Sequence, residues 1–220
     1  MPFLTSCNIA CGFHGGDPLT IKKTIDLALK HNVKIGAHPS FHDIEGFGRN
    51  KINISKEEIK MILLYQISAI QGLVRSVGKE LHHVKPHGAL YNIASVNDEI
   101  AKIIVEVIKM IKPKLKLYGP SMLNWKNISE DIGVDYVSEV FSDRNYNDNL
   151  TLVDRSKENA MIIDPHESLN HVVRMIEKKE VKTINGNLKS IIADTICIHG
   201  DQSNAVDFAK TIYNYFKRKK

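Results

Sequence analysis

Short runs of apolar residues alternate along the chain with longer segments in which apolar residues recur every three or four positions. The short runs predict buried β-strands, and the longer segments predict amphipathic helices. The clearest helical periods run from Ile59 to Val77 and from Ile100 to Ile111. The predicted strands are residues 5–11, 33–38, 81–85, 115–118, 134–140, 160–163 and 193–199.

Several predicted helices also carry clear start signals. Asp17-Pro18 and Asp164-Pro165 each place a capping carboxylate before a proline suited to the first helical position, and Ser55 with Glu58 has the spacing of a capping box. Glu167 stands at the same capping-box spacing after Asp164. Strands that alternate with helices and are apolar almost throughout are typical of an α/β protein with a parallel sheet.

Polar residues follow nearly every predicted strand. Barrel enzymes collect their chemistry at the carboxyl ends of many strands, whereas an open sheet concentrates it at one switch point, so a (β/α) barrel explains the pattern better. Seven strands in 220 residues is short for the eightfold form. We therefore expect an irregular or incomplete seven-stranded barrel that forms a single domain over residues 1–220.

Composition narrows the class of protein. Hydrophobic residues make up 43% of the chain and charged residues 25%, which allows a sizeable core and excludes a disordered protein. There is neither a signal-like start nor an apolar run of the roughly 20 residues that span a membrane, so we expect a cytoplasmic protein with no membrane partner. The net charge of +5 is scattered, which favours small anionic substrates over nucleic acid. The three cysteines are expected to be reduced.

The first predicted strand ends in His14, Gly15 and Gly16, directly before Asp17. Glycines permit close approach of the backbone, and a helix N-terminus attracts anions, so this loop is suited to a carboxylate or a phosphate. A simple capped turn fits the same residues equally well. Within the strand, Asn8 is expected to face the barrel interior, which turns Cys11 towards the helices as a buried structural thiol.

The next two strands end in further candidates. His38 shares a face with Gly36, whose missing side chain would leave room in front of the imidazole. Lys85 ends an apolar strand and is followed by His87; it is either salt-bridged or placed to hold a developing negative charge. Arg49 closes a glycine-containing segment, residues 40–49, that could serve as a lid or anion clamp.

The later strands supply candidates for proton transfer. General acids and bases are groups whose pKa can be moved towards neutrality by burial or by a charged neighbour. The four candidates are Glu139, Asp143, His199 and Asp201, and the sequence does not rank them. The sequence contains no P-loop, dinucleotide-binding or esterase motif.

Five segments at these strand ends, taken together, resemble the LamB/YcsF family. They are NIACGFHGGDP (8–18), IGAHPSFHDIEGFGR (35–49), HVKPHGALYN (83–92), EVFSDRNY (139–146) and DTICIHGD (194–201). The resemblance implies an irregular barrel related to sugar deacetylase barrels. It also implies opening of the 5-oxoproline lactam to L-glutamate with hydrolysis of ATP, together with subunits B and C of an oxoprolinase complex. ATP is expected as a complex with Mg, and no tightly bound cofactor is expected.

The resemblance also distributes roles among the residues. The expected catalytic residues are His14, His38, Lys85, His87, Glu139, Asp143, His199 and Asp201. The expected substrate-binding residues are Asn8, Gly15, Gly16, Arg49, Arg144 and Arg155.

The chain departs from the family pattern at Asn50, at Leu150 and at its beginning. Relatives begin with a strand of the form D-x-N-x-D-x-G-E, about 30 residues before the position of Met1, a spacing typical of a βα unit. We therefore expect that a first strand is missing, and that Met1 is an internal methionine of a longer protein or the start of a truncated one.

Two other functions fit the same residues. One is a metal-dependent, deacetylase-like hydrolase that uses His14 and His38 with an acidic ligand. The other is a non-catalytic partner that binds the other oxoprolinase subunits. The sequence leaves a metal requirement open.

Overall fold

The computed structural model describes residues 1–111 and 115–219. The chain divides into two compact units. The first comprises Met1–Gly119 with Leu123–Val137, and the second comprises Pro120–Met122 with Ser138–Lys220. Strand β5 (Tyr136–Phe141) begins in the first unit and ends in the second. The expectation of a single domain over residues 1–220 stays a prediction.

Six strands form one sheet in the order β1-β2-β3-β4-β5-β8. Its first two members, β1 (Ser6–Ala10) and β2 (Lys34–His38), are parallel, with Ala10 beside His38. β2 in turn is parallel to β3 (His83–Val84), and β3 to β4 (Lys116–Pro120). β5 is parallel to β8 (Thr195–Cys197). The predicted α/β class is confirmed, and the carboxyl ends of β1, β2 and β3 lie at one edge of the sheet.

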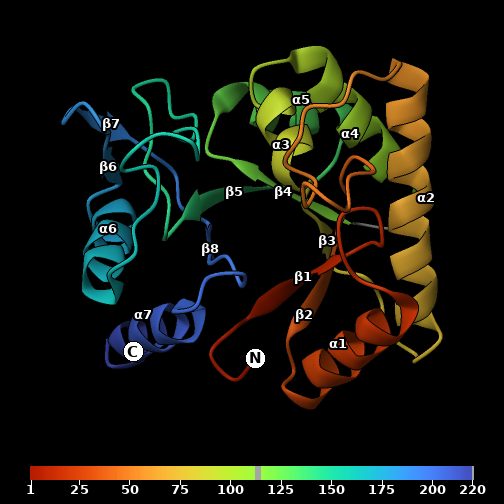
Figure 1. Cartoon of the computed structure of the whole chain (residues 1–220), viewed down its shortest axis with the longest axis horizontal. Coiled ribbons are helices and arrows are strands. Elements are labelled where there is room, and N and C mark those ends of the chain that lie inside the picture. Colours follow the sequence, from red (N-terminus) through yellow and green to blue (C-terminus); the bar gives the residue numbers. More distant parts are fainter. Residues whose placement is uncertain (112–114, 220) are drawn as a thin grey trace. The chain divides into compact units, whose positions relative to one another are not determined.

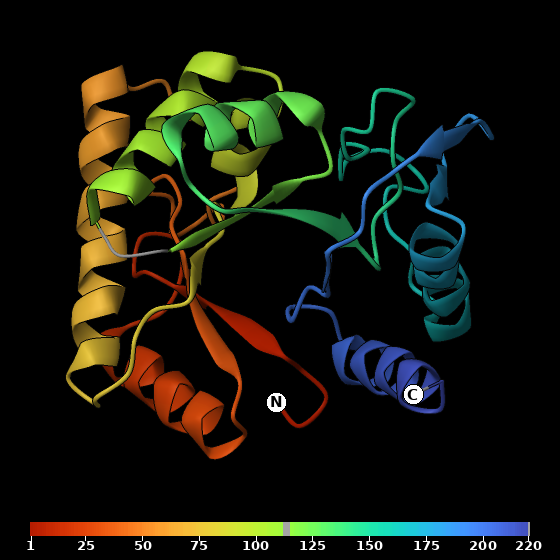
Figure 2. The same cartoon turned by 180° about the vertical axis from the view of Figure 1, so that it is seen from behind.

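Five helices belong to the first unit: α1 (Pro18–Lys30), α2 (Lys56–Arg75), α3 (Gly88–Ala94), α4 (Asp98–Ile111) and α5 (Leu123–Ile132). α1 packs on β1 and β2, and α2 packs on β2. Helix α4 contacts α2, α3 and α5, as Figures 1 and 2 show from opposite sides. Their apolar faces and the strands form one core that includes Ile25, Leu63, Val84, Ile104 and Leu117.

The second unit contains two helices, α6 (Pro165–Glu177) and α7 (Ala205–Lys217), which pack against each other. It also contains an antiparallel hairpin of β6 (Glu180–Lys182) and β7 (Leu188–Ser190) that sequence reasoning missed. Each of these strands has three residues, and β7 is exposed throughout, so neither shows an apolar run.

The predicted strand at residues 160–163 is wrong. Met161 forms only an isolated bridge with Arg144, and the amide of Ile162 donates to the carbonyl of Asp143 at 3.0 Å. This apolar segment pairs with a loop, and in the described ranges the sheet has six strands. The expected seven-stranded barrel with a missing first strand is therefore not confirmed.

The predicted helix starts are confirmed. Asp17 Oδ1 accepts the amides of Leu19 and Thr20 at 2.9 and 3.1 Å. Glu58 Oε2 accepts the Ser55 amide at 2.8 Å while the Ser55 hydroxyl accepts the Glu58 amide at 3.2 Å, which completes a capping box. These contacts fix where α1 and α2 begin.

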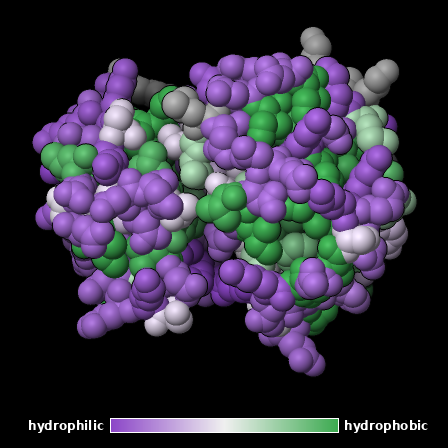
Figure 3. Space-filling view, turned by 90° about the horizontal axis from the view of Figure 1, so that it is seen from above, coloured by the Kyte–Doolittle hydropathy of each residue, from purple (hydrophilic) through white to green (hydrophobic). Residues whose placement is uncertain are grey.

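Hydrophilic side chains cover much of the face seen in Figure 3, with hydrophobic residues exposed between them. Within residues 1–111 and 115–219, no helix has the length and apolar character needed to cross a membrane.

Candidate active site

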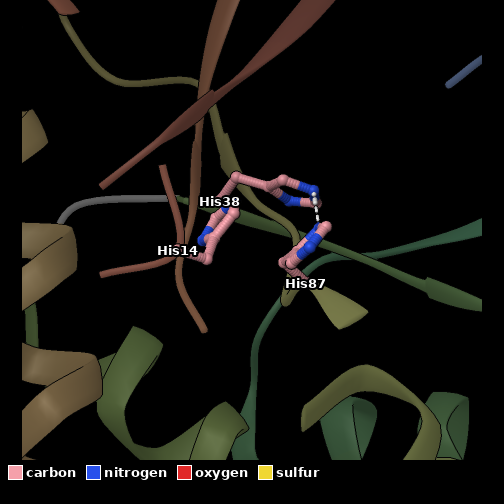
Figure 4. A group of neighbouring side chains, drawn as sticks. All are labelled: His14, His38 and His87. Carbon is pink, nitrogen blue, oxygen red and sulfur yellow. Dashed lines mark hydrogen bonds between the residues drawn. The ribbon is translucent and has the colours of Figure 1, made fainter. Parts of the chain in front are cut away.

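Three histidines from consecutive strand ends meet in the first unit (Figure 4). His14 follows β1, His38 ends β2, and His87 follows β3 and precedes α3. The rings of His14 and His87 are stacked with centroids 4.0 Å apart, and the centroids of His38 and His87 are 4.7 Å apart. One ring nitrogen of each residue lies within 4.8 Å of the others, so the group could hold a metal ion. We call these residues the histidine cluster.

Hydrogen bonds fix the position of the proton on each ring of the histidine cluster. His38 Nδ1 lies 2.6 Å from the carbonyl of Lys85, and His87 Nε2 lies 2.7 Å from the carbonyl of Phe47. A carbonyl only accepts, so both nitrogens carry a hydrogen. His14 Nδ1 lies 2.7 Å from the hydroxyl of Ser40, whose own hydrogen goes to the carbonyl of Phe41. His14 Nδ1 is therefore also a donor.

Burial keeps the histidine cluster uncharged. It lowers the pKa of His14 to about 4, with a smaller contribution from the charge of Arg49. Burial also lowers the pKa of His87 to about 3 and that of His38 well below its ordinary value. All three imidazoles are neutral at pH 7, which is the form that accepts protons and binds metals.

Lys85 brings a positive charge to the same edge of the sheet. Its residue is 4% exposed, and its amide donates to the carbonyl of Ala37 at 3.0 Å. Its charge contributes to the lowered pKa of both His38 and His87. Arg49 lies near the cluster as well, with its guanidinium carbon 5.0 Å from the centroid of the Phe47 ring. A buried ammonium beside neutral imidazoles is suited to hold a substrate carboxylate or a developing oxyanion.

Gly36 makes room for a different histidine from the one predicted. A Cβ at this position would lie 2.2 Å from His83 Nε2, so the missing side chain accommodates the ring of His83 and not that of His38. His83 Nε2 lies 2.8 Å from Asn8 Oδ1, which links β3 to β1 across Gly36 of the intervening strand β2. Sequence reasoning missed His83, although its alternation with Lys85 on the strand placed both on one face.

The glycine loop before α1 is a capped turn. Gly16 has a φ of +80°, and a Cβ there would lie 3.1 Å from the carbonyl oxygen of Ala10. The amides of Leu19 and Thr20 at the start of α1 are already bonded to Asp17. The structure thus gives Gly16 a conformational role in the loop that carries His14, and the expectation that Gly15 and Gly16 bind substrate stays a prediction.

The second unit holds another histidine paired with a carboxylate. His199 Nδ1 lies 2.9 and 3.0 Å from the two oxygens of the fully buried Asp143, which also accepts from the side chain of Gln202. Such a pair orients an imidazole for proton transfer. Sequence reasoning missed Gln202.

The other two predicted carboxylates differ in exposure: Glu139 in β5 is buried, whereas Asp201 is exposed.

The two predicted arginines of the second unit contact their own loop. Arg144 is buried and donates from Nε to the carbonyl of Ala160 at 3.4 Å and from Nη2 to that of Val153. Arg155 Nη1 lies 3.4 Å from the sulfur of Met161. Their expected contact with substrate stays a prediction.

Cysteine chemistry does not contribute to this site. Cys11 is buried in the core of the first unit, and burial raises the pKa of its thiol to about 12. Cys7, Cys11 and Cys197 are not joined in disulfides within the described part of the chain.

The parallel strands define an α/β protein. Its polar residues gather at the carboxyl ends of β1, β2 and β3, where barrel enzymes have their active sites. The chain belongs to the LamB/YcsF family, which it matches over residues 1–220.

Relatives from bacteria agree with this assignment. The chain is 44% identical over 218 residues to a protein from Bacillus cereus (strain AH187) that is named as the A subunit of 5-oxoprolinase, covering 99% of this chain and 86% of the relative. It matches the protein of the same name from Bacillus mycoides (strain KBAB4) with the same identity and coverage. The crystal structure of a lactam utilization protein from Thermus thermophilus superposes with a TM-score of 0.90 at 37% identity, covering 99% of this chain and 87% of that one.

Proposed function

We propose that this protein is the A subunit of a 5-oxoprolinase, which opens the 5-oxoproline lactam to L-glutamate. The observation that carries the proposal is the meeting of the histidine cluster and Lys85 at the ends of β1, β2 and β3. The names of the relatives, which concern 5-oxoproline and lactams, supply the substrate class.

Lactam opening requires two kinds of group. The bond between the carbonyl carbon and the ring nitrogen breaks, an oxygen from water joins the carbon, and the nitrogen leaves as an amine after gaining a proton. Buried neutral imidazoles are suited to position and activate the water, and a buried ammonium is suited to the substrate carboxylate or the oxyanion. His199 is oriented by Asp143 within the second unit, and this pair by itself is also suited to proton transfer.

An amide carbonyl is a poor electrophile, so the proposed reaction is coupled to ATP. Transfer of the γ-phosphate of ATP, with Mg bound to the ATP, to the carbonyl oxygen would make the carbonyl carbon more electrophilic. Water would then add to that carbon, the bond to the ring nitrogen would break, and hydrolysis of the resulting acyl phosphate would release inorganic phosphate and L-glutamate. The relatives are named as one subunit of a larger enzyme. We therefore propose that this chain works with subunits B and C in the cytoplasm, without a nucleic-acid or membrane partner. In this proposal ATP hydrolysis belongs to the assembly.

The direct test is release of glutamate from 5-oxoproline by the purified chain. We expect release when ATP and subunits B and C are all present, and none when any one of them is omitted. No glutamate from the complete mixture would overturn the proposal.

A second candidate is a metal-dependent amide hydrolase that needs no ATP. The observation in its favour is the histidine cluster, in which His87 takes the place of the acidic ligand expected beside His14 and His38. Glutamate release by the chain that is equally fast with and without ATP would favour this candidate.

A further inference from the structure

We propose that the histidine cluster binds one divalent transition-metal ion of the zinc class, with His14 Nε2, His38 Nε2 and His87 Nδ1 as ligands. The inference goes beyond the proposed function and does not depend on it, because it concerns which ion these three rings hold and not which substrate is opened.

The proton positions carry the argument. His38 gives its Nδ1 hydrogen to Lys85 and His87 gives its Nε2 hydrogen to Phe47, so in the neutral rings the other nitrogen of each has a bare lone pair. These two nitrogens, His38 Nε2 and His87 Nδ1, lie 3.0 Å apart, and Figure 4 shows the two rings directed at each other there. Two lone pairs at that distance repel unless something positive lies between or beside them.

A proton is a poor choice for that positive group. It would make one ring cationic beside Lys85, whose side chain is buried and whose carbonyl accepts from His38, and near Arg49, which lies over the ring of Phe47. A metal ion satisfies both lone pairs at once. With metal–nitrogen distances of about 2.0–2.1 Å, two ligands about 3 Å apart subtend an angle of about 90° at the metal, which transition metals accept.

The third ring completes the set. His14 Nδ1 donates to Ser40, so its Nε2 is the nitrogen left to bind. The ring is 2% exposed and lies parallel to that of His87, with an interplanar angle of 7° and centroids 4.0 Å apart, so binding by both requires one of the two rings to turn towards the ion. Each of the three rings thus contributes one unprotonated nitrogen, and ligand atoms from all three lie within 4.8 Å of one another.

The surroundings resemble the outer shell of a metal site. Ligating histidines donate their second ring N–H to a carbonyl, carboxylate or hydroxyl, which fixes the tautomer and the ring orientation. Here the acceptors are the carbonyls of Lys85 and Phe47 and the hydroxyl of Ser40. In the described part of the chain the cluster contains no carboxylate or thiolate ligand. Three imidazoles favour zinc or a similar ion and leave a coordination position for water or substrate.

Metal content of the intact, purified chain tests the proposal. After the protein is stripped with a chelator and given Zn²⁺ or Co²⁺, elemental analysis after gel filtration measures the bound metal, and the visible spectrum reports the Co²⁺ ligands. The variants are His87→Gln and His14→Gln. His82→Gln is the matched control, because His82 is a half-buried histidine of the same unit outside the cluster. Thermal unfolding followed by circular dichroism confirms that each variant is folded.

We expect about one metal ion per wild-type and His82→Gln chain, at least tenfold weaker binding by both cluster variants, and Zn²⁺-dependent thermal stabilisation only where binding is intact. Equal metal content in all four proteins, absence of binding by the wild type, or a Co²⁺–thiolate absorption band would each overturn the proposal. If one cluster variant does not fold, the other decides. None of these readouts requires 5-oxoproline, so failure here is distinguishable from failure of the proposed function.

Discussion

At the scale of single residues, the close approach of Gly36 and His83 leaves no room for a side chain at position 36. A Cβ added at Gly36 would lie 2.2 Å from His83 Nε2, which is hydrogen-bonded to Asn8. Gly36→Ala should therefore destabilise the fold by about 1–3 kcal/mol, the usual cost of overpacking a core. Urea unfolding measures the change.

Gly72→Ala is the matched control for this substitution. Gly72 lies within helix α2, and a Cβ there meets nothing within 4 Å. Alanine should stabilise that helix by about 0.5–1 kcal/mol. If the two substitutions change stability by the same amount, the packing of His83 against Gly36 described above is wrong.

The sequence identified all three residues of the histidine cluster but not their hydrogen-bond partners. Histidines directly after apolar runs were visible in the pattern, and parallel neighbouring strands bring such positions together. That Gly36 pairs with His83 depends on the register between β2 and β3, which is a tertiary property. The acceptor role of Ser40 and the contribution of Gln202 likewise arise from chain segments distant in sequence.

At the scale of elements, the N-cap residue Asp17 stabilises the start of helix α1, which directly follows the loop that carries His14. Asp17 accepts two amides and the hydroxyl of Thr20. Asp17→Ala should destabilise the protein by about 1 kcal/mol through loss of the cap. The measurement is the midpoint of urea unfolding.

Asp26→Ala serves as the comparison for the cap. Asp26 lies in the same helix and forms only an exposed ion pair with Lys22, so its loss should change stability by about 0.5 kcal/mol or less. An effect of Asp17→Ala no larger than that of Asp26→Ala would show that the cap does not stabilise α1.

Elements were predictable where an apolar pattern and a terminus signal coincided. The strands at 5–11 and 33–38 and the helices beginning after Asp17 and Ser55 met both conditions. The run at 160–163 pairs with residues of a loop through an isolated bridge, whereas the β6–β7 hairpin is too short and too polar to produce a strand pattern. Burial alone therefore does not distinguish a strand from a packed loop.

At the scale of the whole molecule, buried neutral histidines predict how stability depends on pH. Burial lowers the pKa of His83 to about 3 and that of His171 to about 4. The unfolded chain binds protons at these residues below about pH 6.5, while the folded protein does not, so acid favours unfolding. Stability should fall as the pH decreases from about 6.5 to about 4, by up to about 1.4 kcal/mol per pH unit for each histidine.

Urea unfolding at pH 7, 6 and 5 checks this expectation. His171→Phe should make the dependence on pH shallower, whereas His166→Gln, which replaces an exposed histidine of the same helix, should leave it unchanged. Stability that is constant or rises as the pH falls through this range would contradict the description of these residues as uncharged in the folded protein.

We propose that the polar groups at the ends of β1, β2 and β3 open the lactam, and Lys85 is the buried cation among them. The most direct measurement is the rate of glutamate release from 5-oxoproline, with ATP and subunits B and C, by wild type, by Lys85→Met and by the exposed control Lys79→Met. We predict that Lys85→Met remains folded and loses at least about 100-fold in rate, as expected when a group that stabilises developing charge is removed, while Lys79→Met matches the wild type. Equal rates for a folded Lys85→Met and the wild type would contradict the account.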